Sequence, residues 1–391
     1  MKLNATSVVA LLIAVSTAAS SPALFDNGQY VDWKSFVANG VNIGCWLEVE
    51  YSCYEDWWAS LGTTAIDEWD LCEQLGDRCP EVMNAHYASF INFTSIDQVA
   101  AVGVNTLRIP TTYAAWINVP GSKFYHGDQL AYLTTIVDYA ITRYGMHIVI
   151  GLHSLPGGVN MLDIGEAFGH DSWFYNTTNL AYSLQAVNAI ATYIQTSGHA
   201  NSFSIEPINE AADNFANFGT CGGLTAAGAS YVAAYINSAI AAVSKINSRI
   251  PIVMQDCFCG ESFWSPYFNT SANLVFDTHV YYFAGSGVYS EYVAPAVCGQ
   301  AATLAGDNLF PVFVGEWSLQ TTYNNTFTNR ATIFDTQRYA WSKYVHGGTM
   351  WNIVHYGNAT VSGQGEQQNY WSYIGLIEAG VITPATTASY C

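Results

Sequence analysis

Two short segments place carboxylates where apolar, strand-like runs end. FSIEPINE ends in Glu206, Asn209 and Glu210, and PVFVGEW carries Glu316 next to its end. Carboxylates near a core are costly unless they are paired or used. Glu210 and Glu316 together would be the minimal equipment for cleaving a glycosidic bond, because one protonates the leaving oxygen while the other attacks the anomeric carbon or activates water. Residue alternation points Glu206 inward one layer below Glu210, so we interpret Glu206 as structural.

Eight apolar runs of strand length recur along the chain. They cover residues 40–46, 104–110, 147–153, 202–210, 251–256, 273–281, 311–317 and 348–356. Helical patterns lie between several of them, as in residues 128–145 and 180–198, and Gly145 fits the end of the first. Such alternation predicts an α/β protein with a parallel sheet covered on both faces, and eight units predict a (β/α)8 TIM barrel. A polar and aromatic insert, residues 50–85, follows the first strand.

In such a barrel the active site lies at the carboxyl ends of the strands. Polar and aromatic residues gather at those ends beside Glu210 and Glu316, namely Trp46, Glu50, Arg108, His153, Asn209, His279, Tyr281 and Trp351. Arg108, His279 and Tyr281 could keep a carboxylate ionised, and Trp351 offers a flat face to a sugar ring.

Structural interpretations of some of these residues stay open. Arg108 could instead be an ion-pair partner of Glu206. His153 could be a core histidine, and Trp46 and Trp351 could be core aromatics.

The amino-terminal sequence has the layout of a secretory signal peptide. Residues 1–20 combine one early cation, Lys2, with an apolar run and small residues near the expected cleavage site. We expect residues 21–391 to form a single catalytic domain, secreted and soluble, with no later run long enough to span a membrane. The 11 basic and 30 acidic residues give a formal charge of −19, which disfavours binding to nucleic acid or anionic membranes.

Glycosylation and disulfides are expected in a secreted chain. Five N-x-[ST] sequons lie at Asn92, Asn176, Asn269, Asn324 and Asn358, and we expect N-glycans there. The chain has nine cysteines, so most should pair and at least one should stay unpaired. Cys257 and Cys259 form a CxC motif without histidine ligands, which favours a disulfide or a buried thiol over a metal site. We expect no metal and no other cofactor.

The chain resembles glycoside hydrolase family 5, particularly its fungal exo-β-1,3-glucanase and diglycosidase branches. The resemblance rests on the segments GVNIGCWLEVE, IDEWDLCEQLG, GVNTLRIP, GLHSLPGGVNMLD, INEA, DTHVYY and VGEWS and on the Trp351 strand. It implies a retaining mechanism with Glu210 as acid/base and Glu316 as nucleophile. The positions that it matches to the sugar nearest the cleaved bond are Arg108, His153, Asn209, His279, Tyr281 and Trp351. It also implies that Glu50 and Asp163 hold sugar further into the pocket, and that Cys298 and Cys391 form a bridge.

The chain departs from the exo-glucanase pattern near the expected outer sugar and leaving group. Cys45 stands in place of a second glycine, Tyr51 replaces a proline, and the insert segment SCYEDWWASLG is unlike theirs. In these segments the chain is more similar to fungal rutinosidases, which remove rutinose (rhamnose α-1,6-linked to glucose) from flavonoid glycosides such as rutin. The alternatives are an exo-β-1,3-glucanase acting on cell-wall β-glucan and a sugar-binding barrel without catalysis.

Overall fold

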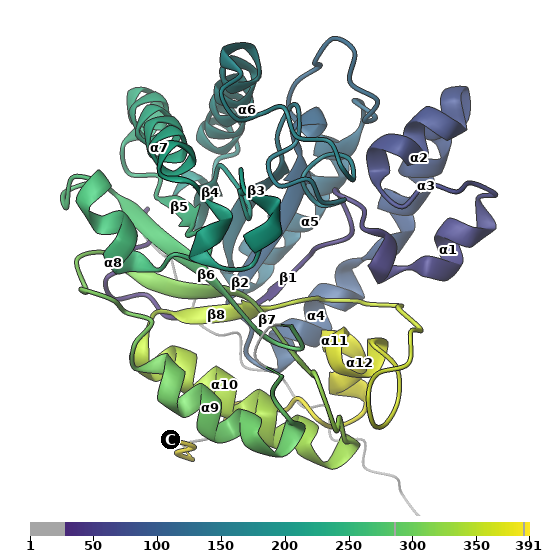
Figure 1. The fold of residues 1–391 in the computed structure, drawn as a ribbon, viewed down its shortest axis with the longest axis vertical. Helices are drawn as coiled ribbons and strands as arrows, with labels where there is room; N and C mark the ends of the chain where they lie inside the picture. Colours follow the sequence, from purple (N-terminus) through teal and green to yellow (C-terminus); the bar gives the residue numbers. More distant parts are fainter. Residues whose placement is uncertain (1–27, 285–286, 386–387) are drawn as a thin grey trace, which may run out of the picture.

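The computed structural model describes residues 28–284, 287–385 and 388–391. Eight parallel strands pair in chain order and close into one barrel (Figure 1). The strands are β1 (Ala38–Asn42), β2 (Thr106–Thr112), β3 (His147–Ser154), β4 (Phe203–Glu206), β5 (Ile252–Gln255), β6 (Leu274–Tyr282), β7 (Val312–Thr321) and β8 (Gly347–Met350). The predicted (β/α)8 barrel is therefore confirmed. The predicted signal peptide, residues 1–20, lies outside the described residues.

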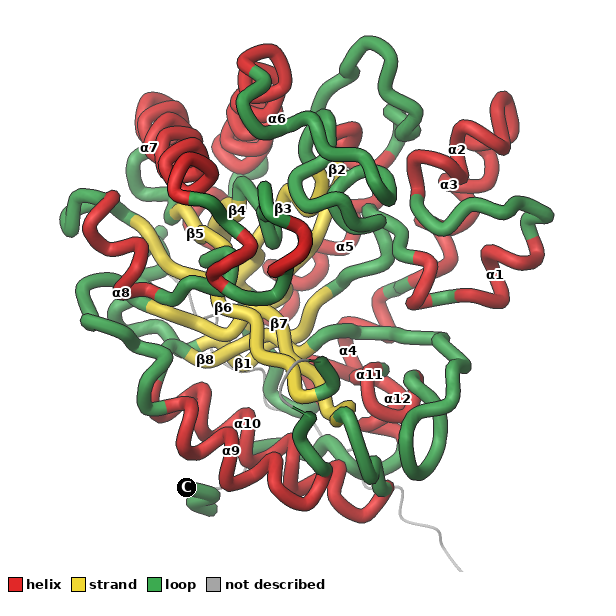
Figure 2. The backbone as a smooth tube through the Cα atoms, in the orientation of Figure 1, coloured by secondary structure: helices red, strands yellow, loops and turns green. Residues whose placement is uncertain are grey.

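Helices surround the strands, as Figure 2 shows in red around yellow. The long outer helices are α5 (Gln129–Tyr144), α6 (Thr177–Thr196), α7 (Ala226–Asn247) and α10 (Arg330–Tyr344). Shorter ones are α8 (Glu261–Trp264), α9 (Val293–Ala301), α11 (Gln368–Trp371) and α12 (Tyr373–Glu378). The predicted glycine stop is confirmed, because Gly145 follows α5 with a left-handed φ of 65° and its N–H donates to the carbonyl of Ile141.

The segment between β1 and β2 forms a helical insert with α1 (Glu55–Ser60), α2 (Glu68–Leu75), α3 (Cys79–Phe90) and α4 (Phe93–Ala101). Trp46 is buried beneath it and donates from Nε1 to the carbonyl of Tyr87 on α3. Trp46 is thus a core residue of the insert and does not line the active-site cavity described below.

Three strands end four or more residues earlier than predicted, and β7 runs four residues further than predicted, to Thr321. β4 ends at Glu206 because Pro207 has no N–H to continue the ladder, so Glu210 lies in the following loop. β1 ends at Asn42 and β8 at Met350, four and six residues earlier than the pattern predicts. At all three places the apolar run continues after the chain has left the sheet.

Four disulfides join Cys45–Cys53, Cys72–Cys79, Cys221–Cys259 and Cys298–Cys391. The bridge to Cys391 that the resemblance implies is confirmed. In the CxC motif Cys259 is paired and Cys257 is a buried free thiol, so both non-metal interpretations are correct. Cys45 has a φ of 61°, a conformation that favours glycine, which fits the glycine of the exo-glucanase pattern at this position.

One described helix, α7, is long and apolar enough to cross a membrane by length and composition. The sequence-based expectation that no later run has this length is therefore wrong. Length alone does not make a span, since α7 packs against α6 and buries the face that carries Val232, Ile236 and Val243. These contacts are those of an outer barrel helix.

Candidate active site

Glu210 and Glu316 meet at the carboxyl end of the barrel. One carboxylate oxygen of each and one ring nitrogen of His279 all lie within 4.8 Å of one another. Both carboxylates are nearly buried, with 7% and 5% of their residue surfaces exposed. Retaining glycosidases hold their two carboxyl groups about 5–5.5 Å apart, whereas inverting enzymes leave about 6.5–9.5 Å for a water. The short separation is that of the retaining type.

Donors hold both oxygens of Glu316. Arg108 donates to Oε1 at 2.7 Å, and the Tyr281 hydroxyl donates to Oε2 at 2.8 Å. Burial raises the pKa of Glu316, while the charges of His279 and Arg108 and the bond from Tyr281 oppose that rise. The bonds from Arg108 and Tyr281 fix the orientation of the Glu316 carboxylate and stabilise its negative charge.

Arg108 lies fully buried below the cavity. Its guanidinium donates to Glu206 at 2.7 and 3.0 Å and to the Asn209 side-chain oxygen at 2.9 Å. The open alternative of an Arg108–Glu206 ion pair is thus correct, and it coexists with the contact to Glu316. Removing one partner of such a buried pair typically costs about 3–5 kcal/mol. Arg108 therefore anchors both Glu316 and the loop that carries Glu210.

His279 bridges the two carboxylates. Its Nδ1 lies 2.6 Å from Glu210 Oε1 and 3.5 Å from Glu316 Oε2, and its Nε2 lies 3.6 Å from Asp277 Oδ2. Burial opposes the charge of His279, but Glu316 and Asp277 outweigh burial and raise its pKa well above the usual value. Asp277 was missed by the sequence analysis, although it precedes His279 by two residues and so shares its face of β6.

The backbone of Glu210 is held from the neighbouring strand and loop. Its N–H donates to Gln255 Oε1 at 3.0 Å, and its carbonyl accepts from Asn160 Nδ2 at 3.2 Å. Glu210 has a φ of 44°, uncommon for a residue with a side chain. Gln255 and Asn160 therefore position Glu210, and neither was identified from the sequence.

His153, Trp351 and Glu50 form another wall of the cavity. The His153 ring stacks on Trp351 with centroids 5.5 Å apart and an interplanar angle of 17°. His153 Nε2 lies 3.8 Å from Glu50 Oε1 and 3.3 Å from Asn209 Nδ2. Burial and the charge of Arg108 lower the pKa of His153 well below its usual value, so the ring is neutral. This wall combines a flat aromatic face with polar groups, which suits a sugar.

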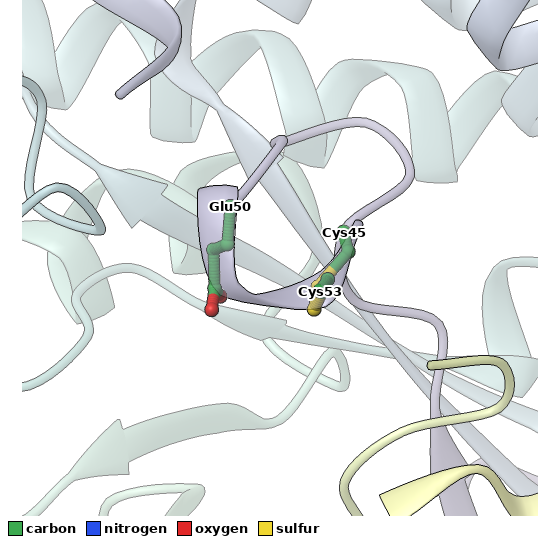
Figure 3. A group of neighbouring side chains, drawn as sticks. All are labelled: Cys45, Glu50 and Cys53. Carbon is green, nitrogen blue, oxygen red and sulfur yellow. A yellow bond between two sulfur atoms is a disulfide. The ribbon is translucent and has the colours of Figure 1, made fainter. Parts of the chain in front are cut away.

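The Glu50 carboxylate lies next to a disulfide of the insert. Figure 3 shows the Cys45–Cys53 disulfide beside it, and sulfur and carboxylate atoms lie within 4.8 Å. Because both sulfurs are in the disulfide, this group offers no thiolates to a metal. Burial and then the charge of Asp163 raise the pKa of Glu50. Asp163 itself is half-buried with a pKa raised to about 6 by burial, and it does not line the cavity, unlike Ile164.

The cavity above these residues has a volume of about 600 Å³. Four further aromatic residues line it, from the segments that follow four different strands: Phe218, Phe258 and Phe283 in loops and Trp371 at the end of α11. The Phe218 and Phe258 rings lie 5.5 Å apart, and the Cys221–Cys259 disulfide ties their two loops together. On the other side the Phe283 and Trp371 rings lie 5.0 Å apart. None of these four residues was identified from the sequence, because the segments between strands and outer helices carry no regular apolar pattern.

Comparisons with known proteins agree with this geometry. Residues 79–357 match the family model described as cellulase, glycosyl hydrolase family 5. The chain belongs to glycosyl hydrolase family 5. It is therefore a glycoside hydrolase, and the retaining mechanism is typical of this family.

Three proteins within the comparisons show which members of the family this chain is similar to. A probable glucan 1,3-beta-glucosidase A from Aspergillus niger is 30% identical over 317 residues, covering 80% of this chain and 72% of the relative. The crystal structure of a rutinosidase from Aspergillus niger is 46% identical with a TM-score of 0.89, covering 91% of this chain and 100% of that one. The AoRut structure is 47% identical with the same TM-score, covering 90% and 99% of the two chains. This family 5 hydrolase is thus more similar in sequence to these two structures than to the glucosidase.

Buried titratable groups around the site predict how stability depends on pH. Burial raises the pKa of Glu68 and Glu166 to about 8 and lowers that of His86 and His355 to about 4. The glutamates stabilise the fold fully below their unfolded pKa of about 4.3 and lose this contribution as pH rises to about 8. The histidines stabilise it above about 6.5 and lose their contribution as pH falls to about 4.

We therefore expect the melting temperature to be highest between about pH 4.5 and 6.5. Thermal unfolding at constant ionic strength from acid to mildly alkaline pH would measure this. A melting temperature that keeps rising up to pH 8 would contradict the assignment of these groups.

Proposed function

We propose that this family 5 hydrolase is a secreted diglycosidase that releases rutinose from flavonoid glycosides such as rutin. The observation that carries the proposal is the pair Glu210 and Glu316 beneath a cavity with aromatic outer walls. The likeness to the Aspergillus niger rutinosidase supports the same substrate class. The four disulfides and the sequence pattern of residues 1–20 support secretion.

In the proposed mechanism Glu316 attacks the anomeric carbon while Glu210 gives its proton to the glycosidic oxygen. The carbon–oxygen bond to the aglycone breaks, and a covalent glycosyl-enzyme on Glu316 forms. Glu210, now a carboxylate, then takes a proton from water, whose oxygen attacks the anomeric carbon and frees Glu316. An alcohol in place of water would give transglycosylation. No step requires a cofactor.

The contacts around the two carboxylates suggest roles for the remaining polar residues. Arg108, Tyr281 and His279 stabilise the charge that returns to Glu316 in the second step, since each lies within 3.5 Å of its carboxylate. Asn209, His153 and Trp351 bind the glucose unit next to the scissile bond. Glu50, which lines the cavity, binds the rhamnose unit beyond it, whereas Asp163 lies outside the cavity lining and acts on Glu50 through its charge.

The aromatic walls favour a planar aglycone. Stacking on Phe258 and Phe218 on one side and on Phe283 and Trp371 on the other would bury a flavonoid ring system without requiring hydrogen bonds. A glucan chain would instead present hydroxyl groups to these rings. The second candidate, an exo-β-1,3-glucanase, is favoured by the 30% identity to the probable glucan 1,3-beta-glucosidase A.

Product analysis separates the two candidates. We expect purified protein to release rutinose and quercetin from rutin, and little sugar from the β-1,3-glucan laminarin, at mildly acidic pH. Chromatography of both reactions identifies the products. Glucose from laminarin with rutin unchanged would establish the exo-glucanase. No turnover of either substrate or of a chromogenic β-glucoside would favour the non-catalytic alternative.

The role of the aromatic walls is testable at Phe283, which is 36% exposed at the rim of the cavity. We expect Phe283→Ala to lower kcat/KM for rutin about fivefold, because a lost stacking contact is worth about 1 kcal/mol. Hydrolysis of a β-rutinoside with a small alkyl aglycone should stay within about twofold, since that group has no ring system to stack. Equal losses on both substrates would show that Phe283 acts on the fold or the sugar sites.

A further inference from the structure

A second cavity lies outside the active site and has a volume of about 590 Å³, within the usual range of about 300–1,000 Å³ for small-ligand sites. It lies where α3 and α4 meet the segments that follow β8, and Figure 1 places α4 beside α11 and α12. Phe90, Gln98, Arg330 and Gln368 are among its lining residues. The cavity thus combines an aromatic ring with amide and guanidinium donors. None of these residues takes part in the proposed mechanism.

The sequon Asn92-Phe93-Thr94 lies at this cavity. Asn92 lines it and caps α4, accepting from the Ser95 N–H at 3.2 Å through Oδ1. The side-chain nitrogen of Asn92, the atom that would carry a glycan, makes no hydrogen bond with any described residue. The exposed Thr94 hydroxyl is equally unengaged within the described part of the chain. The cap therefore fixes the amide in orientation and leaves its nitrogen available.

We propose that Asn92 carries an N-glycan whose first N-acetylglucosamine is seated in this cavity and forms part of the folded structure. In the modification a bond forms between Asn92 Nδ2 and the anomeric carbon of the sugar. The amide loses one proton, and the lipid diphosphate of the oligosaccharide donor leaves. The inference rests on secretion, because donor and transferase belong to the secretory pathway.

The cavity offers the contacts that such a sugar needs. Phe90 precedes Asn92 by two residues and presents its ring to the same space, where it can cover the apolar face of a pyranose. Arg330 is held at the cavity by its bond to the Asn369 carbonyl at 2.9 Å. Gln98, bonded to Glu378 at 3.4 Å, is one of the amides that can meet the acetamido and hydroxyl groups. A sugar here would have both its apolar and its polar faces satisfied.

A neighbouring cavity also reaches Asn92 but suits a sugar less well. It has a volume of about 330 Å³, and Trp46, Tyr87, Phe93 and Tyr132 are among its lining residues. Sugar hydroxyls buried against such an apolar lining would lose hydrogen bonds to water without replacement. The larger polar cavity is therefore the seat that we assign.

A sugar bound in this cavity would also contact the wall that it shares with the active-site cavity. His355 lines both this cavity and the active-site cavity, and its ring lies 5.8 Å from that of Trp371. Filling the space behind His355 would hold this wall in place. Loss of the glycan should therefore lower thermal stability more than loss of a glycan that only reaches into solvent.

The test uses threonine variants that leave the helix cap intact. Thr94→Ala removes the sequon, and Thr94→Ser keeps it. Thr178→Ala is a matched control, because Asn176 also caps a helix, α6, but does not line this cavity. All proteins are produced in a glycosylating eukaryotic host. Glycopeptide mass spectrometry then measures occupancy at Asn92 and Asn176, and the rate of enzymatic deglycosylation of the folded protein at each.

We expect Asn92 to be occupied and to lose its glycan at least tenfold more slowly than Asn176. Thr94→Ala should lower the melting temperature by about 2 °C or more, while Thr94→Ser and Thr178→Ala should change it by less than about 1 °C. An unmodified Asn92, equal deglycosylation rates, or equal melting temperatures for the two alanine variants would each overturn the proposal. Hydrolysis of rutin is assayed separately, so a failure of the proposed catalytic function would be seen independently of the glycan.

Discussion

Replacing Glu316 with alanine is expected to lower kcat for rutin by about 10⁴-fold or more, since removing a covalent nucleophile costs up to about 10⁶-fold in other hydrolases. Glu316 has one oxygen bonded to Arg108 and the other to Tyr281, and it lies within 4.8 Å of Glu210. A retaining mechanism needs the covalent bond between the Glu316 carboxylate and the sugar, and alanine cannot form that bond. Steady-state rates measured by quercetin release give the result directly.

The control for this variant is Glu291→Ala, which removes an exposed carboxylate and should leave the rate within about twofold, as is usual for surface substitutions. Azide provides a second readout. It can take the place of the missing carboxylate in Glu316→Ala and should give the glycosyl azide of inverted, α configuration. A Glu316→Ala protein with near-normal rates, or a β-glycosyl azide from it, would be incompatible with the nucleophile assignment.

Replacing Glu210 with alanine should lower kcat/KM for rutin by about 10²–10⁴-fold, the usual contribution of a general acid. The loss should depend on the leaving group. A dinitrophenyl β-rutinoside leaves without protonation, so formation of the glycosyl-enzyme should stay fast while its hydrolysis becomes slow. Stopped-flow measurement should therefore show a burst of dinitrophenolate followed by a slow steady state.

Azide again distinguishes the two roles. In Glu210→Ala it attacks the glycosyl-enzyme without needing a base and should give the β-glycosyl azide. The same proportional loss on rutin and on the dinitrophenyl substrate, with no burst, would show that Glu210 is not the acid/base.

The barrel and its catalytic end could be predicted because their sequence signals are strong. Parallel strands buried on both faces read as continuous apolar runs, and eight of them between helical patterns leave few other architectures. The carboxyl ends of such strands meet at one rim, so Glu316 and His279 could be placed together without knowing any distance. Glu210 was grouped with them correctly, although it lies in the loop beyond Pro207 and not on β4.

The remaining parts of the site had no comparable signal. Asp277 and Gln255 read as interior strand residues, and only the three-dimensional pairing shows that they hold His279 and Glu210. The aromatic walls come from three irregular loops and the short helix α11, whose positions depend on contacts such as the Cys221–Cys259 disulfide. Trp46 was grouped with the rim because its strand was predicted to be four residues longer than it is. The positions of these residues depend on where each strand ends, and the local pattern of apolar residues does not determine that point.

The most direct test of the proposed mechanism is intact-mass and peptide mass spectrometry of the Glu210→Ala variant mixed with dinitrophenyl β-rutinoside. The slow second step should let the covalent intermediate accumulate, and we expect a mass increase of one rutinosyl unit, located on Glu316. That single result would establish the nucleophile, the retaining mechanism and the disaccharide as the transferred unit. An adduct of a single glucosyl unit, or an adduct on any residue other than Glu316, would contradict it.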